Sequence, residues 1–155
     1  MKQLIALPLI LLTGCSLAPS LDLKTQQLCE QTLYQYTEIR DKGTTKQYTD
    51  LFTQDATFNV KALNVSLSGH EELAQRFDSA RAKNKSIHLL TSSRVFTGAD
   101  QRLSASSNFI LYLKEKSSDS ETKVLAGRYL DTLEVSGSTC KFKHREVLVD
   151  RVDIL

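Results

Sequence analysis

Three histidines are the residues of this chain best suited to acid–base chemistry. An imidazole titrates close to neutral pH, so it can accept or donate a proton under ordinary conditions. His88 is the most promising of the three because it lies in KNKSIHLLTSSRVF, where a polar turn leads into an apolar strand. We expect no functional role for His70, in the first turn of a helix, or for His144, on a late strand.

The motifs of several other chemistries are missing from the sequence. It has no GxSxG elbow of a hydrolase and no glycine-rich loop for a nucleotide. Its three cysteines include no CxxC pair, so we expect no metal site and no cofactor. The net charge is only +2 and no basic patch stands out, which argues against a nucleic-acid partner.

The first residues, MKQLIALPLILLTGC, have the pattern of an export signal. Lys2 precedes an apolar run from Leu4 to Leu12, and small residues follow ahead of Cys15. The run is much shorter than the roughly 20 apolar residues that a membrane-spanning helix needs. We therefore predict that residues 1–14 are a cleaved signal peptide and take no part in the fold.

Leu12-Thr13-Gly14-Cys15 resembles the bacterial lipobox. The resemblance implies that Cys15 becomes the first residue of a lipoprotein and carries diacylglycerol and a further acyl chain. Several acyl chains anchor a protein stably, whereas one holds it only marginally. Ser16 stands where an aspartate would retain the protein in the inner membrane, so the expected location is the outer membrane, facing the periplasm. Residues 15–25 would form the tether; the alternative is an ordinary signal peptide with a chance cysteine.

About 140 residues remain after cleavage, which is enough for one domain with a buried core, placed at 26–155. Of the 20 basic residues, Lys2 leaves with the signal, so 19 face 18 acidic ones. Cys29 and Cys140 are the remaining cysteines, and an oxidising periplasm allows them to form a disulfide. Such a bond would destabilise the unfolded chain by about 4–5 kcal/mol. Two separately buried thiols are the alternative.

Apolar spacing predicts two helices at the start of the domain. The first covers 24–41 and ends at Lys42-Gly43, a usual helix stop. Thr44 or Thr45 can cap a short second helix. The expected buried positions are Cys29, Leu33, Tyr36 and Ile39 in the first helix, and Tyr48, Leu51 and Phe52 in the second.

A third helix is predicted over 70–83, with Leu73, Ala74 and Phe77 buried. Ser68 and Glu71 ahead of it have the spacing of a capping box, in which each side chain bonds to the backbone of the other.

The remaining segments show the period-two alternation of strands. Two short pieces form a predicted hairpin, and four long strands joined by short turns form a predicted antiparallel meander. Helices gathered ahead of such a sheet indicate an α+β fold with one concave face covered. The predicted strands are 57–60 and 64–67 in the hairpin, and 87–97, 103–114, 123–135 and 140–151 in the meander.

Five segments, 51–58, 69–73, 88–92, 127–131 and 142–145, follow one another as they do in SnoaL-like proteins of the nuclear-transport-factor-two-like superfamily. The resemblance extends over about residues 26–151. It implies a cone, in which three helices pack in a strongly curved antiparallel sheet and enclose an apolar pocket that opens at one end. Folds of this kind host unrelated activities, so the function depends on the pocket.

The resemblance also assigns candidate site residues. Asp41 and His88 match an aspartate and a histidine that face each other across the pocket in dehydratase-like members, an arrangement suited to general acid–base catalysis. Tyr129 could donate its hydroxyl to a ligand oxygen. Tyr36, Phe58, Asn108 and Asp131 are expected to line the pocket.

Some positions allow other interpretations or depart from the family pattern. Asp131 could instead pair with Arg145 or Arg128 and brace the sheet. Dehydratase-type enzymes have a second pocket histidine where this chain has Ser106-Ser107-Asn108, and a tyrosine where it has Arg40.

Three functions are compatible with these features. The first is binding of a small apolar or aromatic ligand in the pocket. The second is isomerase, cyclase or lyase chemistry with a His–Asp acid–base pair. The third is an interaction module in the cell envelope, with a homodimer formed through the sheet.

Overall fold

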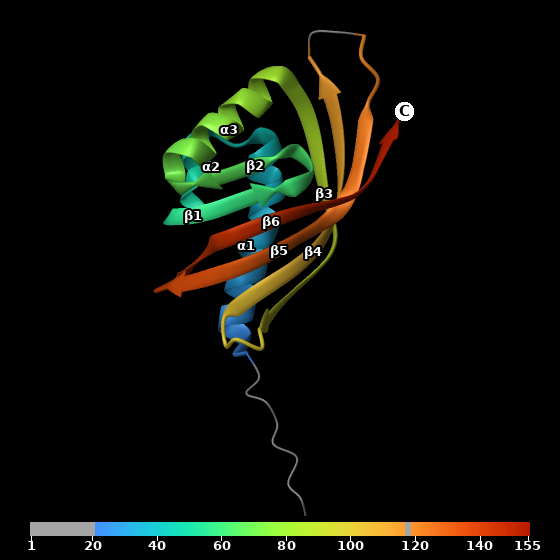
Figure 1. Ribbon diagram of the computed structural model, residues 1–155. Coiled ribbons are helices and arrows are strands. Elements are labelled where there is room, and N and C mark those ends of the chain that lie inside the picture. Colours follow the sequence, from blue (N-terminus) through green and yellow to red (C-terminus); the bar gives the residue numbers. More distant parts are fainter. Residues whose placement is uncertain (1–20, 117–118) are drawn as a thin grey trace, which may run out of the picture.

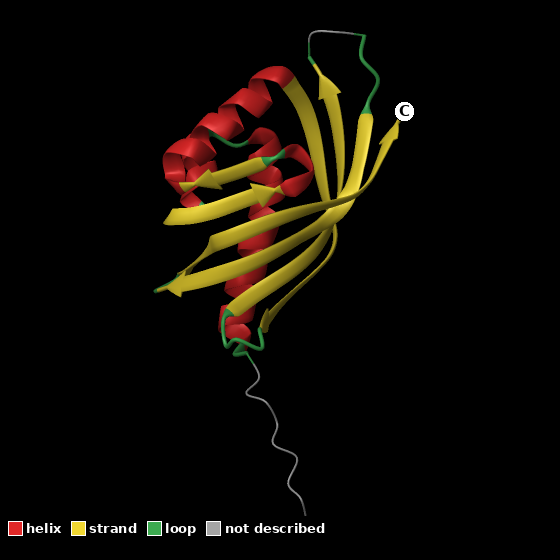
Figure 2. Ribbon diagram, in the orientation of Figure 1, coloured by secondary structure: helices red, strands yellow, loops and turns green. Residues whose placement is uncertain are grey.

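In the computed structural model, which describes residues 21–116 and 119–155, three helices lie against one curved six-stranded sheet. Figure 1 shows the long helix α1 running behind strands β4, β5 and β6, while α2 and α3 lie beside the short strands β1 and β2. Colouring by secondary structure makes the two layers plain (Figure 2). The predicted α+β architecture is confirmed.

Helix α1 spans Leu23–Lys42, close to the predicted 24–41. Asp22 caps its start by accepting a hydrogen bond from the backbone N–H of Thr25, 3.0 Å away. Its apolar side is buried at Cys29, Leu33 and Tyr36, as the spacing predicted. The helix therefore lies with one face in the core, and its last turn leads into α2.

Helix α2 spans Thr45–Asp50 and begins with the predicted threonine cap. Thr44 accepts from the backbone N–H of Gln47, and the Gln47 side chain accepts from the backbone N–H of Thr44. Tyr48 is almost completely buried, as expected. Phe52 is also buried but was placed wrongly in this helix, because it is the first residue of a strand.

Helix α3 spans Gly69–Lys83 and follows the hairpin of β1 (Phe52–Val60) and β2 (Val65–Ser68). The predicted capping box at its start is wrong. The Ser68 side chain makes no cap, and the Ser68 N–H donates to Glu72 Oε2 at 2.7 Å, so Glu72 rather than Glu71 reaches back. Gly69 has φ +76°, a backbone conformation that favours glycine and turns the chain into the helix.

The four long strands form the predicted antiparallel meander. The sheet order is β2-β1-β6-β5-β4-β3, and β1 pairs with β6 in parallel, so the sheet is mixed rather than wholly antiparallel. Bulges interrupt three of the strand pairings, and each increases the local twist of its strand. The long strands are β3 (Asn84–Thr97), β4 (Leu103–Glu115), β5 (Lys123–Ser136) and β6 (Thr139–Ile154).

A disulfide joins Cys29 of α1 to Cys140 at the start of β6, with Cα atoms 5.1 Å apart. Both residues are buried, and the bond closes a sequence separation of 111 residues. Of the two alternatives for these cysteines, the disulfide is therefore correct. It attaches the first helix to the last strand.

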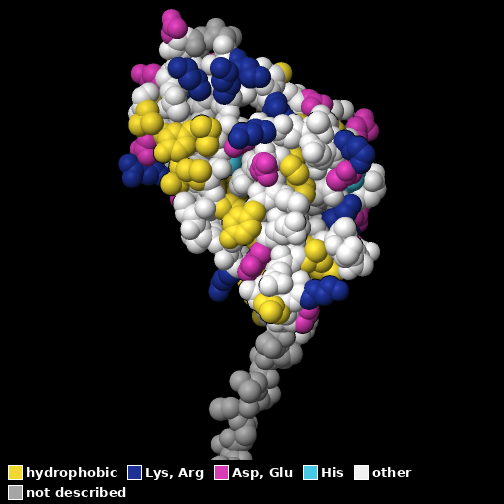
Figure 3. Space-filling view, turned by 180° about the vertical axis from the view of Figure 1, so that it is seen from behind, with side chains coloured by type: hydrophobic (Ala, Val, Ile, Leu, Met, Phe, Trp, Pro, Cys, Tyr) yellow, Lys and Arg dark blue, Asp and Glu magenta, His cyan; other side chains and the backbone are white. Residues whose placement is uncertain are grey.

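Seen from behind, the surface shows separate hydrophobic patches rather than one apolar face (Figure 3). Lys and Arg side chains gather at the end that carries the turn between β4 and β5. Among the helices of the described chain, none has the length and hydropathy needed to cross a membrane. The predicted signal peptide and Cys15 lie outside the described residues.

Candidate functional site

The side chains of Asp41 and His88 meet at the C-terminal end of α1. Asp41 lies in the last turn of the helix, and His88 lies on the adjacent part of β3. His88 Nδ1 is 2.5 Å from Asp41 Oδ1, and both side chains are nearly buried, with exposures of 5% and 11%. The structure thus brings together the two residues that the family resemblance paired.

Two further hydrogen bonds fix the carboxylate of Asp41. The backbone N–H of His88 donates to Oδ2 at 2.6 Å, and the Ser86 hydroxyl donates to Oδ1 at 2.7 Å. These donors compensate an acid at a helix C-terminus, where the helix dipole disfavours negative charge. Ser86 was not predicted, although its position two residues before His88 places both side chains on one face of β3.

This geometry determines which nitrogen of the imidazole carries the proton. A carboxylate can only accept, so Nδ1 donates to Asp41 and Nε2 keeps its lone pair. Burial lowers the pKa of His88 below its ordinary value of 6.5; Asp41 opposes this effect, and Arg40 and Arg145 add to it. Burial alone would raise the pKa of Asp41, but the hydrogen bonds from His88 and Ser86 outweigh it and hold the pKa below 3.8. At neutral pH the pair is a carboxylate and a neutral imidazole.

His88 lines a cavity of about 100 Å³ inside the cone. This volume is below the 300–1,000 Å³ of most ligand pockets, so aromatic rings fill much of the predicted hollow. Tyr36, Phe58 and Tyr129 line it as predicted. The other apolar residues of the wall are Val60, Leu63, Phe77, Phe109, Leu111, Leu125, Val147 and Val149.

Stacked rings form the floor of the cavity. Phe109 stacks on Tyr129 with ring centres 4.4 Å apart, and Tyr36 meets Tyr129 edge-on at 5.6 Å. Burial raises the pKa of Tyr129 well above its usual value, so its hydroxyl stays protonated and able to donate. Tyr36 also lies edge-on to His88, with ring centres 6.4 Å apart.

Beneath these rings lies a buried ion pair. Arg145 Nε and Nη2 donate to the two carboxylate oxygens of Asp131 at 2.8 and 2.9 Å, and neither side chain is more than 1% exposed. Burial raises the pKa of Asp131 although Arg145 opposes it; burial alone would lower the pKa of Arg145, but Asp131 raises it. The pairing of Asp131 with Arg145 was the alternative interpretation, and it is confirmed.

Two predicted lining residues do not reach the cavity. Asp131 faces inward, but both of its carboxylate oxygens accept hydrogen bonds from Arg145, and the residue does not line the cavity. Asn108 is exposed on the outer face, where its amide donates to Ser92 at 2.9 Å. The reason is the two-residue period of β4, because the inward position belongs to its neighbour Phe109.

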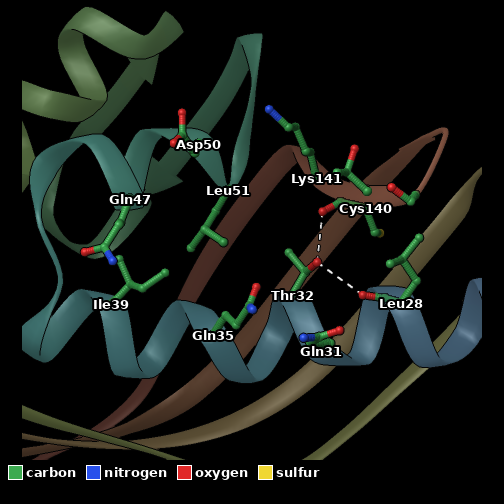
Figure 4. Close-up of a pocket in the computed structure, with 12 residues that line it drawn as sticks. Leu28, Gln31, Thr32, Gln35, Ile39, Gln47, Asp50, Leu51, Cys140 and Lys141 are labelled. Atoms are coloured by element: carbon green, nitrogen blue, oxygen red, sulfur yellow. Dashed lines mark hydrogen bonds between the residues drawn. The ribbon is translucent and has the colours of Figure 1, made fainter.

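A wider groove of about 380 Å³ lies on the other side of α1, close to the disulfide. Figure 4 shows Thr32 in this groove, where its hydroxyl contacts the carbonyl oxygens of Leu28 and Cys140. The groove is open to solvent, and its polar walls come largely from exposed glutamines such as Gln31 and Gln35. It holds no imidazole, so the smaller cavity at His88 is the better candidate site.

Residues 21–116 and 119–155 contain no group of three His, Cys, Asp or Glu side chains placed to hold a metal ion. His88 can accept a proton through Nε2, and a tyrosine hydroxyl can donate to an oxygen.

Comparison with sequence families identifies the class of the protein. The SnoaL-like domain model matches residues 22–146, and the chain belongs to this family. No curated protein matches it. The expected family, and with it the cone of the nuclear-transport-factor-two-like superfamily, is confirmed.

Solved structures of the same fold come from several bacteria. A candidate scytalone dehydratase from Novosphingobium aromaticivorans is 16% identical, with a TM-score of 0.73 over 82% of this chain and 85% of that one. A hexachlorocyclohexane dehydrochlorinase from Novosphingobium barchaimii is 13% identical, with a TM-score of 0.72 over 83% and 88%. A ketosteroid-isomerase-like protein from Catenulispora acidiphila, solved with trimethylamine, is 11% identical, with a TM-score of 0.61 over 76% and 83%. At these identities the likeness establishes the fold alone.

Proposed function

We propose that the protein is a proton-transfer enzyme of the lyase or isomerase type, with His88 as general base and Asp41 as its positioning residue. The observation that carries this proposal is the 2.5 Å contact between His88 Nδ1 and Asp41 Oδ1. It leaves Nε2 as the basic nitrogen of a residue that lines an apolar cavity. A general base must be unprotonated before it acts, and burial lowers the pKa of His88, which favours the neutral imidazole.

In the proposed reaction, Nε2 of His88 removes a proton from a carbon next to a carbonyl group. The electron pair of the broken C–H bond moves into the carbonyl oxygen, which becomes an enolate, and the Tyr129 hydroxyl donates a hydrogen bond to it. If the substrate has a C=C bond next to that carbon, the anion is a dienolate, and the imidazolium returns the proton to its far carbon, which shifts the double bond and gives isomerisation. If the neighbouring carbon instead bears a leaving group, the electron pair from the C–H bond forms a C=C bond to that carbon, and the group leaves with its own electron pair.

The structural neighbours support this reaction class over simple ligand binding. They include a candidate dehydratase, a dehydrochlorinase and a hypothetical protein with a ketosteroid-isomerase-like fold. Eliminations and allylic isomerisations of this kind require removal of a proton from carbon.

Proton abstraction can be tested without knowing the product. Small ketones of four to six carbons, beginning with butanone, are incubated with the protein in D₂O, and loss of their α-proton signals is followed by NMR. We expect the protein to accelerate exchange and His88→Gln to reduce the rate by about 10²–10⁴-fold. His144→Gln is the matched control, because His144 bonds Thr57 outside the cavity. Equal rates for the protein and for His88→Gln would contradict the proposal.

The second candidate function is a carrier for a small apolar or aromatic ligand. The cavity walls favour it, because His88 is the only imidazole among the described lining residues, and none of those residues has a carboxyl group. A carrier would gain thermal stability from butanone as its occupancy rises. It would show no exchange of α-protons and would tolerate His88→Gln.

The proposed location is the periplasmic face of the outer membrane, with Cys15 as the lipidated residue. The Cys29–Cys140 disulfide supports an oxidising compartment. Cys15→Ser should release the protein from membranes or block its processing, which cell fractionation would detect. Unchanged membrane retention would contradict the lipid anchor.

The outer face of the sheet is a proposed surface for a homodimer. Ile87 and Leu89 on β3 and Leu130 on β5 are 59%, 45% and 36% exposed. Light scattering of the purified protein would measure its mass. Ile87→Lys should shift a dimer to the monomer, and a monomeric wild type would exclude the proposal.

A further inference from the structure

Two arginines lie at the mouth of the cavity that contains His88. Arg40 comes from the last turn of α1 and Arg76 from α3, and both are partly exposed lining residues. The deeper walls are apolar or tyrosine, and none of the described lining residues is acidic. The cavity therefore has positive charge at its mouth without a matching negative charge in its walls.

Neither arginine is neutralised elsewhere. In the described part of the chain, neither forms an ion pair with a carboxylate. Arg40 rests on aromatic faces instead, with its Cζ atom 5.9 Å from the ring centre of Tyr48 and 5.4 Å from that of Phe77. Stacking of this kind fixes the position of a guanidinium and leaves its N–H groups free to bind an anion.

A third guanidinium lies below the cavity, where Asp131 balances its charge, so the unpaired charges are those of Arg40 and Arg76. Nη1 of buried Arg145 has no hydrogen-bond partner among the described residues, while Nε and Nη2 bind Asp131. The Cζ atom of Arg145 lies 3.9 and 4.3 Å from the ring centres of Tyr36 and Tyr129, both of which line the cavity. Charges of one sign around an apolar cleft raise the local concentration of the opposite ion.

The volume of the cavity limits what its apolar part can hold. A dry cavity of about 150 Å³ takes a benzene molecule. At about 100 Å³, this one accepts a chain of a few carbon atoms but not a complete aromatic ring. A ligand with a larger body would have to extend through the mouth, past Arg40 and Arg76.

We infer that the natural ligand is a small organic anion, with a short apolar chain in the cavity and a carboxylate, or a group of equal charge, held between Arg40 and Arg76. The inference rests on the proposed function, because it assumes that the cavity is the ligand site. It replaces the neutral apolar or aromatic ligand predicted from the sequence with a charged one. A guanidinium pairs well with a carboxylate because its parallel N–H groups match the two oxygens.

Butanoate and butanamide provide a matched pair of probes, since they have nearly the same shape and differ in charge. NMR titration of the ¹⁵N-labelled protein would follow the amide signals of the cavity residues. We expect butanoate to bind at least tenfold more tightly than butanamide. Arg40→Gln and Arg76→Gln should each weaken butanoate three- to tenfold and leave butanamide unchanged, while Arg40→Lys should retain most of the binding.

Arg94→Gln is the control for net charge, because Arg94 lies on β3 over the ring of Phe96, outside the cavity. It should leave both affinities unchanged; if it weakened butanoate as much as Arg76→Gln, the inference would be overturned. Equal binding of the two probes, insensitive to the arginines, would also overturn it but would preserve the cavity as a ligand site. If neither probe shifted the cavity signals, the inference would fail, and the exchange experiment with butanone would decide the proposed function separately.

Discussion

Arg145 lies directly beneath Tyr36, with its Cζ atom 3.9 Å from the centre of the phenol ring. The same guanidinium contacts the rings of Tyr129 and Phe142 and binds both oxygens of Asp131. One buried cation therefore supports the two tyrosines that form the floor of the cavity. The ion pair therefore supports the site from below and is also part of the core.

The contribution of the Asp131–Arg145 ion pair to stability can be measured by removing one partner. Arg145→Met leaves the Asp131 carboxylate buried without its partner, and we expect a loss of about 3–5 kcal/mol in the free energy of unfolding, measured with urea. The double variant Asp131→Leu with Arg145→Met removes both charges and should recover most of that loss. A double variant as unstable as the single one would mean that ring packing, rather than the unpaired charge, causes the effect.

The pKa of His88 should move in opposite directions in two variants. Asp41→Asn removes the carboxylate that raises it, so the pKa should fall further below 6.5. Arg40→Gln removes a positive charge that lowers it, so the pKa should rise. NMR titration of the His88 Cε1–H signal measures both, with His70 and His144 in the same spectra as internal references. Shifts of the same sign in both variants would contradict the proposed electrostatics.

The free energy of unfolding should decrease in mild acid. The folded pKa of His88 is lowered, so its contribution is complete above the ordinary value of 6.5 and is lost as the pH falls through the folded pKa. The lowered pKa of Asp41 adds a second loss below 3.8. Urea unfolding at a series of pH values should give a flatter curve between pH 7 and 5 for His88→Gln than for the wild type. Parallel curves would show that other groups cause the acid sensitivity.

Removal of the disulfide should strongly destabilise the fold. For a loop closed across 111 residues, the entropic model gives about 5 kcal/mol. The variant with Cys29→Ala and Cys140→Ala should therefore unfold at much lower urea, and dithiothreitol should shift the wild type similarly but leave the variant unchanged. A variant as stable as the oxidised wild type would contradict this prediction.

Gly127 is required by close contacts in the sheet. A Cβ atom there would lie 2.1 Å from the backbone oxygen of Leu148 and 2.9 Å from the Phe109 ring. Gly127→Ala must displace both, so we expect a loss of about 2 kcal/mol or more in urea unfolding. Gly137→Ala, at φ +60° with nothing within 4 Å, should cost only about 1 kcal/mol. A smaller effect at Gly127 than at Gly137 would contradict the packing argument.

Local patterns predicted much of this fold because its elements are long and regular. Helix α1, β4 and β5 lie within one residue of their predicted ends. Strand β3 begins three residues earlier than predicted, and β6 ends three residues later. The start of β1 was missed because its exposed residues Gln54 and Asp55 interrupt the alternation. The parallel pairing of β1 with β6 depends on contacts between distant segments, which no local pattern encodes.

The candidate site was predictable in part. The Asp41–His88 contact joins residues distant in sequence, and it was expected from the family resemblance rather than from spacing. The misplacement of Asn108 shows how a shift of one residue along a strand exchanges the two faces of a sheet. Arg76 could not be predicted as a lining residue, because an arginine on a helix surface is usually solvated.

Helix α1 carries both Cys29 and Asp41, about three helical turns apart. The covalent link that fixes one part of the helix to β6 therefore also helps to hold the acid at its other end against the imidazole. In a reducing compartment the two thiols would stay unpaired, and the chain would lack this link. Without the disulfide, the contact between Asp41 and His88 would depend on non-covalent packing alone.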